Sequence, residues 1–357
     1  MGGKALETPV RAITMSCPCS RGSETNRHFR DGFHRQEGPL SVELAVSTDG
    51  ALSPALVASA ESLGFKNRPN WDFNGGTQED GVGFYQHTVK NGKRHSSAAA
   101  FLAPFLSREN LKARPWSLTT RVLADKGRVT GVEYVSNDWE VHIARARREV
   151  IVCAGTIDSP QLLLLSGIGP EDELRKHGIP VLHHLPGVGR NFQDHPAVGA
   201  EFETDRAQLG DRAGAAHTVG LFTRTAACPA TDSPDMQLFA WETLSRGAGP
   251  GDAGTKDSAS FWLAAFSATA SSRGRISLRS ADPLRPPVIQ GNFLQRQRDV
   301  AALIAFYALP RELANTRPLA GLLTGELRPG KSRRSRRDLE EFARQHMVRR
   351  HSSGRDL

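Results

Sequence analysis

The chain has few of the residues that build covalent frameworks, metal sites or membrane spans. Its 357 residues include only four cysteines, Cys17, Cys19, Cys153 and Cys228. The C-P-C spacing of the one close pair matches neither a C-x-x-C redox centre nor half of a zinc site. No other His or Cys spacing follows a usual ligand pattern, so the sequence predicts no metal site. Cys153 lies in an apolar run, which predicts a buried structural thiol.

Long apolar segments are also absent. No run of about eighteen apolar residues occurs, so no transmembrane helix is predicted. The first 22 residues contain Lys4 but no continuous apolar core of secretory type. We therefore expect a cytoplasmic protein. Residues 1–23 are rich in Gly, Pro, Ser and Cys without apolar periodicity, and we expect them to be a disordered lead-in.

The net charge of +8 is concentrated at one end of the chain. Residues 331–357 contain nine Lys or Arg and four acidic residues, whereas the rest of the chain is close to neutral. A basic tail of this kind could contact nucleic acid or anionic lipid. However, no aromatic residues are interleaved to stack on bases. The pattern favours a solvated, partly helical tail, and no nucleic-acid partner is expected.

The apolar pattern alternates between helical and strand periods along the chain. A continuous β-branched run at 149–153 predicts a strand that is buried on both faces. The other predicted elements are an amphipathic helix at 54–64, a loop at 68–83, a helix at 96–106, an antiparallel meander over 117–146, a helix opening at Ser159-Pro160, strands at 235–241, 261–270 and 275–278, and a helix at 297–315 interrupted at Pro310.

A short turn joins the predicted strand 149–153 to the helix that follows it. Ala154 and Gly155 leave the backbone bare at this turn, just before a helix N-terminus. Bare amides and the helix dipole favour the phosphate or ribose atoms of a nucleotide. Such turns are also common in α/β proteins for packing reasons alone, so the turn by itself does not identify a nucleotide site.

Longer segments carry a family resemblance. The run REVIVCAGTIDSPQLLLLSGIGP at 148–170, continued by ELRKHGIPVLHHLPGVGRNFQDHP at 173–196, resembles the most distinctive segment of the glucose-methanol-choline oxidoreductases. The segments 72–114 and 271–294 resemble further blocks of the family. FHRQEGPLSV at 33–42 is similar to the family's His-Gly…Gly-Pro-Leu entry, with Arg35 where Gly is usual. The resemblance covers roughly residues 24–346 and is nearest to the choline-dehydrogenase-like branch.

The resemblance implies an α/β plus α+β fold: a partial FAD-binding, Rossmann-like domain with an antiparallel-sheet substrate domain. By this comparison, residues 24–196 form the partial FAD-binding region. Residues 197–327 form the substrate domain, with the family's C-terminal region beginning near 270. Residues 328–357 are a truncated basic tail.

The resemblance also implies a function, namely oxidation of a small-molecule alcohol by hydride transfer to N5 of FAD, with a histidine as general base. The matched cofactor residues are Thr119, which touches adenine through its backbone, Ala154 and Gly155 beside the ADP portion, and Asn91 and Ser96 in a loop near the cofactor. Asn191, Asp194 and His195 match a further motif whose role could be structural. The electron acceptor is not indicated.

The sequence departs from the family pattern at both ends. The family begins with a GxGxxG unit and a downstream acidic residue, and neither is present in this chain. The segment from Glu326 to Gly330 matches a Glu-x-x-Pro-Gly motif, after which His351 is the candidate catalytic base. The alternative is that His351 is a solvent-exposed histidine on a basic tail. We therefore expect a truncated enzyme, half of a split enzyme that needs a complementing N-terminal polypeptide, or a non-catalytic remnant that does not bind FAD alone.

Overall fold

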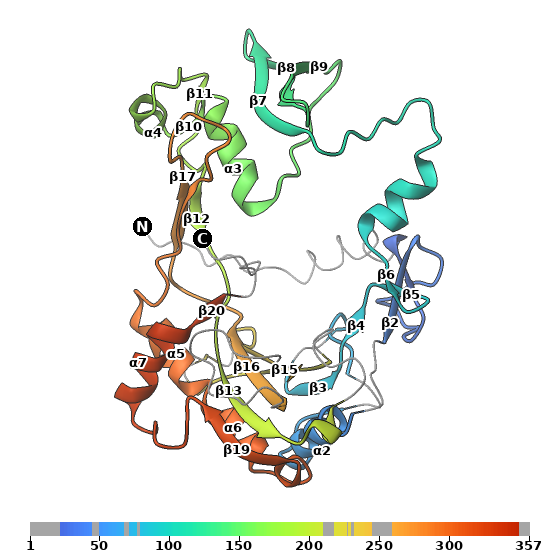
Figure 1. The fold of residues 1–357 in the computed structure, drawn as a ribbon, viewed down its shortest axis with the longest axis vertical. Coiled ribbons are helices and arrows are strands. Elements are labelled where there is room, and N and C mark those ends of the chain that lie inside the picture. Colours follow the sequence, from blue (N-terminus) through green and yellow to red (C-terminus); the bar gives the residue numbers. More distant parts are fainter. Residues whose placement is uncertain are drawn as a thin grey trace. The chain divides into compact units, whose positions relative to one another are not determined.

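The computed structural model describes residues 22–44, 50–67, 71–76, 79–209, 218–226, 228–229, 232–244 and 259–349. By their contacts the residues divide into two compact units. Unit 1 combines residues 1–111, 195–269 and 300–357, and unit 2 combines residues 112–194 and 270–299. Figure 1 labels the elements of both units along the chain. No helix among the described residues is long and apolar enough to span a membrane.

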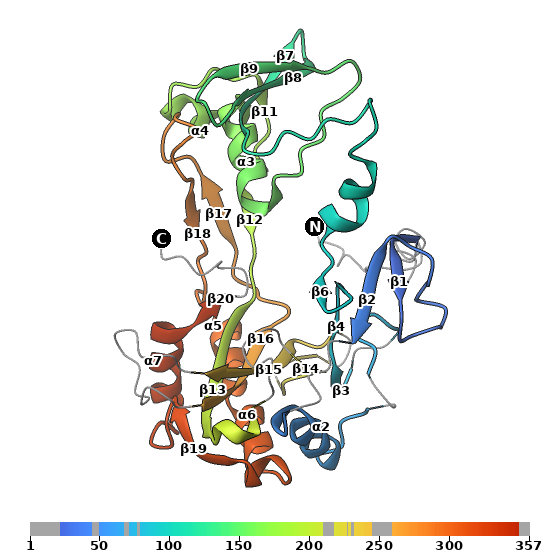
Figure 2. The same cartoon turned by 45° about the vertical axis from the view of Figure 1, so that its right-hand side comes forward.

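Unit 1 is built on a seven-stranded sheet with antiparallel pairing throughout. Its main path runs β19-β13-β16-β15-β14-β3, and β20 pairs with the start of β13 whereas β19 pairs with its end (Figure 2). The strands are β3 (Gly81–Phe84), β13 (Pro196–Thr204), β14 (Val219–Thr223), β15 (Met236–Leu244), β16 (Ala259–Ser267), β19 (Leu323–Arg328) and β20 (Val348–Arg349). The predicted strands at 235–241 and 261–270, and their antiparallel pairing, are confirmed.

Helices cover one face of this sheet. Helix α2 (Leu52–Ser62) and helix α6 (Ala308–Ala314), with the short turn η4 (Leu319–Gly321), contribute to one apolar core with alternate residues of the strands. Leu56, Leu263 and Leu313 in this core are at most 1% exposed. The predicted helix at 54–64 is confirmed, although it begins at Leu52.

Smaller elements complete unit 1. Strands β1 (Glu24–Asn26), β2 (Leu40–Leu44) and β4 (Gln86–His87) form a three-stranded sheet. The remaining short elements are β5 (Val89–Lys90), β6 (Lys93–Arg94), η1 (Ala98–Leu102), η2 (Ala103–Phe105) and η3 (Arg206–Gln208). The helix predicted at 96–106 is thus a π turn followed by a 3-10 turn, and Pro104, which lacks an amide donor, lies at the start of the second turn.

The C-terminal helices lie where the sequence predicts a helix, but the break between them is at another position. Helices α5 (Gln297–Ala305) and α6 replace the predicted helix at 297–315, but the break falls at 306–307 rather than at Pro310. Pro310 lies in the first turn of α6, where backbone amides have no intrahelical acceptor and a proline is tolerated. Helix α7 (Arg336–His346) begins with a capping box between Ser335 and Asp338.

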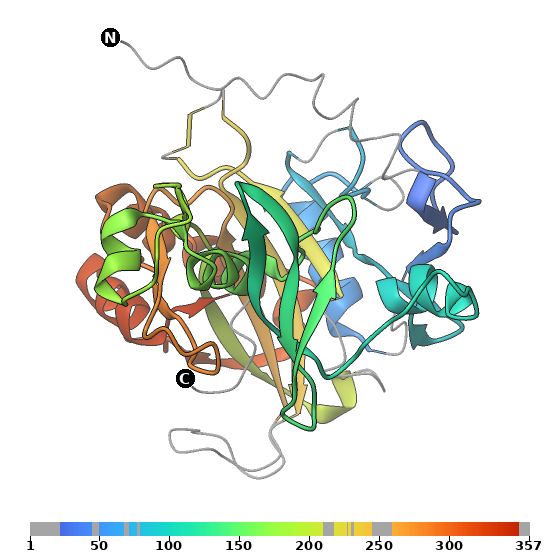
Figure 3. The ribbon, with the colours of Figure 1, turned by 90° about the horizontal axis from the view of Figure 1, so that it is seen from above.

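Unit 2 contains the predicted meander, as β7 (Leu118–Asp125), β8 (Arg128–Val135) and β9 (Val141–Arg145). It also holds helices α3 (Gly155–Leu165) and α4 (Glu171–Lys176), and strands β10 (Ile168–Gly169), β11 (His183–His184), β12 (Arg190–Phe192), β17 (Gly274–Ser277) and β18 (Val288–Gln290). A small core of Leu164, Leu174 and Leu278 joins α3, α4 and the residue after β17. Figure 3 shows the three meander strands side by side.

Two predictions for unit 2 are wrong, and the start of a third element is shifted. Residues 149–153 form no strand, and Ile151 is 75% exposed. Cys153 is exposed rather than buried. A continuous apolar run produces a strand buried on both faces only where neighbouring strands are available. Among the described residues, no strand pairs with this segment. Helix α3 also begins at Gly155, four residues before the predicted opening at Ser159.

Candidate functional site

The face of the large sheet opposite to α2 carries aromatic rings and small residues. In β16, Phe261 and Leu263 belong to the core under the helices. Side chains alternate along a strand, so Trp262 and Phe266 point to the opposite face. There Phe266 stacks on Phe239 of β15, with ring centroids 4.2 Å apart. The chain therefore builds a second, aromatic layer on this sheet in addition to its main core.

A row of cross-strand partners explains why the rings can lie close to the sheet. The row runs through Gly83, Gly220, Phe239, Ala264 and Gly199 in directly opposed positions. A Cβ atom at Gly220 would lie only 2.2 Å from Cζ of Tyr85. Glycine at this position is thus required for the Tyr85 ring to pack here. The Tyr85 hydroxyl accepts a hydrogen bond of 2.8 Å from Nε2 of Gln237, which fixes the ring.

The next row places two tryptophans opposite each other. Trp241 of β15 pairs in register with Trp262 of β16, and Trp262 pairs with Glu201 of β13. Trp241 is 43% exposed. Glu201 accepts a hydrogen bond of 2.7 Å from the Ser260 hydroxyl and forms an ion pair of 3.5 Å with Arg328. Exposed indole faces suit flat or cationic groups of a small molecule. The alternating aromatics of β15 and β16 are visible in the sequence, but by themselves they predict only strands.

In unit 2, the predicted turn at the start of α3 is open. Ala154 and Gly155 are both exposed, and Gly155 has a φ of +83°. A Cβ atom at Gly155 would find no atom within 4 Å. The first amides of α3 therefore remain accessible to an anionic or ribose group. The assignment of Ala154 and Gly155 to the cofactor stays a prediction.

Thr119 lies in β7 of the same unit, paired with Tyr134 of β8. Helix α3 is attached to β7 by a hydrogen bond of 2.8 Å from the Val122 amide to the Ser166 hydroxyl. Ser166 follows the C-terminal end of α3, whereas Ala154 and Gly155 precede its N-terminal end. Strand β7, which carries Thr119, is thus hydrogen-bonded to the C-terminal end of α3, whereas Gly155 lies at the N-terminal end of this helix.

Asn91 and Ser96 belong to unit 1 and are exposed. Asn91 has a φ of +54° in the turn of the β5–β6 hairpin. The Ser96 hydroxyl accepts a hydrogen bond of 3.2 Å from the Ala99 amide at the start of η1. Between them, His95 accepts a hydrogen bond of 3.0 Å from the Ser41 amide at Nδ1. Each of these contacts shapes the local backbone, and both side chains remain exposed to solvent.

His351 lies outside the described residues. Of the second matched motif, His195 ties two strands together, because its Nδ1 donates a hydrogen bond of 2.7 Å to the Ser267 carbonyl at the end of β16. Asn191, with a φ of +60°, lies within β12. The His195 hydrogen bond joins the start of β13 to the end of β16, and a structural role for His195 and Asn191 stays a prediction.

The residues of this chain fit only part of an FAD molecule. The start of α3 is exposed, with no atom within 4 Å of a Cβ built at Gly155. The sequence contains no GxGxxG unit, so the usual cradle of amides for the pyrophosphate is not supplied by this chain. No reaction step through a flavin can therefore be assigned to this chain alone.

Comparisons with known proteins decide the family. Models of the GMC oxidoreductase match residues 21–197 and 270–354. The chain belongs to the GMC oxidoreductase family. It is 36% identical to the mitochondrial choline dehydrogenase of Mus musculus over 351 residues, which are 92% of this chain and 57% of that protein. It is 32% identical to the oxygen-dependent choline dehydrogenase of Rhizobium johnstonii, over 92% of this chain and 62% of that protein.

Solved structures of GMC relatives share the fold. Pyridoxine 4-oxidase from Mesorbium loti superposes with a TM-score of 0.79 at 23% identity, over 94% of this chain and 64% of that chain. Formate oxidase from Aspergillus oryzae, for which FAD modification is described, gives a TM-score of 0.82 at 19% identity, over 94% of this chain and 66% of that chain. The predicted fold class is confirmed, and FAD is the cofactor that the family indicates. The chain spans less than two thirds of the length of the curated GMC relatives named above.

Proposed function

We propose that this chain supplies the substrate sheet and part of the FAD site of a GMC oxidoreductase that oxidises the CH–OH groups of small alcohols. The observation that carries the proposal is the match of both family models in the family's order, at residues 21–197 and 270–354. The aromatic face of the large sheet supports a substrate role for unit 1, because Trp241 and Trp262 offer ring faces beside polar groups.

In this proposal the predicted division of the chain is kept, with the partial FAD-binding region at 24–196 and the substrate domain at 197–327. Thr119, Ala154 and Gly155 would contact the adenosine end of FAD, while Asn91 and Ser96 would lie on a loop near the cofactor. Bound FAD would supply the hydride acceptor. His351 would take the hydroxyl proton of the alcohol, as a general base must.

We further propose that a complementing polypeptide bearing the GxGxxG unit completes the site. Unit 2 exposes apolar side chains that usually lie inside a protein, namely Trp116, Leu118, Val141, Ile143 and Ile151, which are between 45% and 84% exposed. Leu118 and Val141 lie in one row across the meander, and a contiguous exposed apolar patch is typical of a surface that a partner covers. The unpaired segment 149–153 has the composition of an interior strand and would gain its neighbours from that polypeptide.

The alternative is a non-catalytic remnant of the family that binds no FAD. The missing GxGxxG unit favours this alternative for the isolated chain. The two proposals differ in one respect: only the first predicts that flavin binding returns when the missing unit is supplied.

The test is co-expression of the full chain with the GxGxxG-bearing segment of a GMC relative, followed by anaerobic addition of alcohols. The expected result is a flavin-containing complex whose flavin absorbance is bleached by an alcohol. Choline is assayed first, because relatives of this chain are named choline dehydrogenase. His351→Ala should abolish bleaching but leave flavin content unchanged. A complex that holds stoichiometric FAD but is reduced by no alcohol would contradict the proposed activity.

A further inference from the structure

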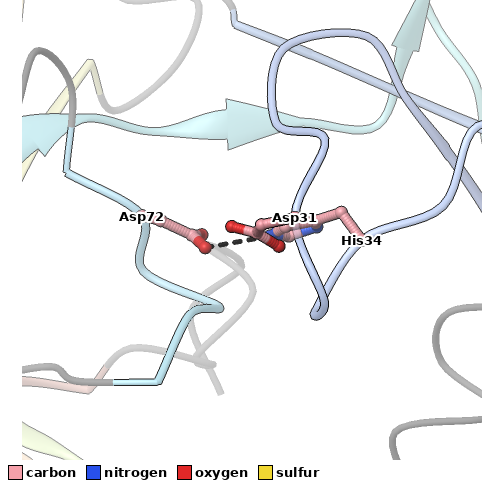
Figure 4. A group of neighbouring side chains, drawn as sticks. All are labelled: Asp31, His34 and Asp72. Carbon is pink, nitrogen blue, oxygen red and sulfur yellow. Dashed lines mark hydrogen bonds and ion pairs between the residues drawn. The ribbon is translucent and has the colours of Figure 1, made fainter.

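Two clusters of charged side chains in unit 1 differ in how completely their members are paired. In the first, Nε2 of His34 lies 2.9 Å from Oδ2 of Asp72 (Figure 4), and Nδ1 lies 2.7 Å from Oε1 of Glu24. Both ring nitrogens therefore have partners, and Arg30 and Arg35 add positive charge at the same hollow. The second cluster lies beside α6, and two of its cations have no acidic partner among the described residues.

This second cluster lines a hollow of about 410 Å³ that is formed by α6, η4, β19 and the residues that follow β19. Small-molecule pockets in proteins have volumes of about 300–1,000 Å³, so the α6 hollow is large enough for a small ligand. Its apolar lining continues the main core of unit 1, because Phe202 and Ala314 belong to that core and Leu323 packs against it. Ala320 of η4 adds a further methyl group. The lining therefore suits a short hydrocarbon chain.

Four charged side chains line the α6 hollow, and two of them cancel each other. Arg311 donates hydrogen bonds of 2.7 Å and 3.1 Å from Nη2 and Nε to the two carboxylate oxygens of Glu326. The other two, Lys331 and Arg334, are both cations, and neither forms an ion pair with a described residue. The lining thus has an excess of positive charge.

Hydrogen bonds hold the turn that carries the two unpaired cations. Nη2 of Arg311 donates to the carbonyls of Gly330 and Arg333 over 3.4 Å and 3.0 Å. Nε of Arg334 donates to the Lys331 carbonyl over 3.1 Å. For the terminal nitrogens of Arg334 and for the Lys331 ammonium, the described residues supply no acceptor. These nitrogens can donate to an anion, and such charge-assisted hydrogen bonds are the strong ones.

Acidic side chains on the neighbouring elements do not line the α6 hollow. Glu203 of β13 accepts a hydrogen bond of 3.1 Å from the Thr324 hydroxyl, and Asp338 takes part in the capping box of α7. Glu312 of α6 is exposed. Only Glu326 contributes a carboxylate to the lining, and it is already bound by Arg311.

We propose that the α6 hollow binds a small amphipathic carboxylate. The carboxylate lies between Lys331 and Arg334. The hydrocarbon chain lies against Phe202, Ala314 and Leu323. A molecule of this class matches both the apolar lining and the excess of positive charge, whereas an inorganic anion would leave the apolar lining in water.

The ligand holds the turn after β19 against α6 and the edge of the large sheet. All the lining residues belong to unit 1, and none is among those assigned to FAD or to the alcohol. Phe202 lies on the helix-covered face of the sheet, whereas the aromatic layer lies on the opposite face. The inference is therefore independent of the proposed function and can be tested without FAD.

The experiment is calorimetric titration of the purified full chain with sodium octanoate at concentrations below those that form micelles. We expect saturable binding of one equivalent with a Kd of about 0.1–1 mM, which is usual for a ligand of this size. Octanoate should also raise the melting temperature. Octanamide has the same chain without the charge, and sodium acetate has the charge without the chain. Each should bind at least tenfold more weakly, because each loses one of the two kinds of contact.

Two double variants locate the binding site. Lys331→Gln combined with Arg334→Gln should weaken octanoate binding at least tenfold, because the charge-assisted hydrogen bonds are lost. Both side chains are exposed, so circular dichroism should show a normal fold. Arg336→Gln combined with Arg337→Gln is the matched control. It removes the same two charges from exposed positions of α7 that do not line the α6 hollow, and the affinity should stay within about twofold of wild type.

Four results would overturn the proposal. The first is that the wild-type chain shows no saturable binding of octanoate. The second is that octanamide binds as tightly as octanoate. The third is that the folded variant lacking Lys331 and Arg334 keeps the wild-type affinity, which would assign octanoate to another apolar surface such as that of Leu118 and Val141. The fourth is that the α7 control loses as much affinity, which would show that only the overall charge matters.

Discussion

The large sheet of unit 1 and the segment 149–153 of unit 2 contain similar apolar runs with opposite results. In β16, the run Phe261–Phe266 is almost entirely buried between the helix-covered core and the aromatic layer. In unit 2, residues 149–153 form no strand, Ile151 and Cys153 are exposed, and Val150 and Val152 are half-buried. The difference is the supply of neighbours, since β16 has β13 and β15 on its two sides and 149–153 has none among the described strands. An apolar run of this kind becomes a buried strand only where neighbouring strands are present to pair with it.

The largest expected effect compares two leucines in strands. Leu263→Ala should lower the free energy of unfolding by about 3 kcal/mol, because Leu263 is fully buried and its removal leaves a cavity. Leu118→Ala in β7 should cost less than about 1 kcal/mol, because Leu118 is 45% exposed. Urea denaturation followed by circular dichroism measures both. Equal losses would show that the exposed face of unit 2 is packed in solution.

This contrast also shows which parts of the fold can be predicted from the sequence. The meander at 117–146, α2 and the strands β15 and β16 were predictable because their periodicity is satisfied within the chain. The segment 149–153 was not, because a run of the same kind needs strands that the described chain does not contain. Cys153 was misplaced for the same reason.

The site was predictable only in part. The open turn at Ala154 and Gly155 followed from small residues before a helix. The alternating aromatics of β15 and β16 are visible in the sequence, but the pairing of Phe239 with Phe266 and of Trp241 with Trp262 joins two separate strands. No local spacing reveals such pairing.

A second prediction concerns an ion pair in the Glu-x-x-Pro-Gly segment. Glu326, with a side chain 7% exposed, binds Arg311 through two nitrogens at 2.7 Å and 3.1 Å and accepts a hydrogen bond from the Gly330 amide. Glu326→Gln should destabilise unit 1 by about 2 to 3 kcal/mol, since it leaves a largely buried guanidinium without its counter-charge. Equilibrium denaturation of the variant checks this value, with Glu340→Gln, in an exposed pair with Arg344, as the control at below about 0.5 kcal/mol. A loss equal to that of Glu340→Gln would contradict the role of the pair.

A third prediction separates backbone from side-chain requirements in unit 2. Gly155→Ala should destabilise the start of α3 by about 1 kcal/mol, because alanine is strained at a φ of +83° although space for its Cβ is available. Thr119→Val should change stability by less than about 0.5 kcal/mol, because a β-branched residue is retained in a strand. Denaturation midpoints compare the two variants. No cost for Gly155→Ala would show that the turn adopts another conformation in solution.

The smallest expected effect tests the unpaired segment. Ile151→Asp should leave the stability of the isolated chain within about 0.5 kcal/mol of wild type, because Ile151 is 75% exposed. In the co-expressed complex with the GxGxxG-bearing segment, the same change should weaken association at least tenfold, because a charge would then be buried between strands. Strong destabilisation of the isolated chain by Ile151→Asp would mean that residues 149–153 are already paired.

The central proposal is that the large sheet of this GMC chain is a substrate sheet and that the chain holds only part of the FAD site. The most direct measurement is the visible absorbance of the purified full chain after incubation with excess FAD and gel filtration. Our account predicts a folded protein with no bound flavin bands. A stoichiometric, protein-shifted flavin spectrum from the isolated chain would contradict it, because the site would then be complete without a GxGxxG unit.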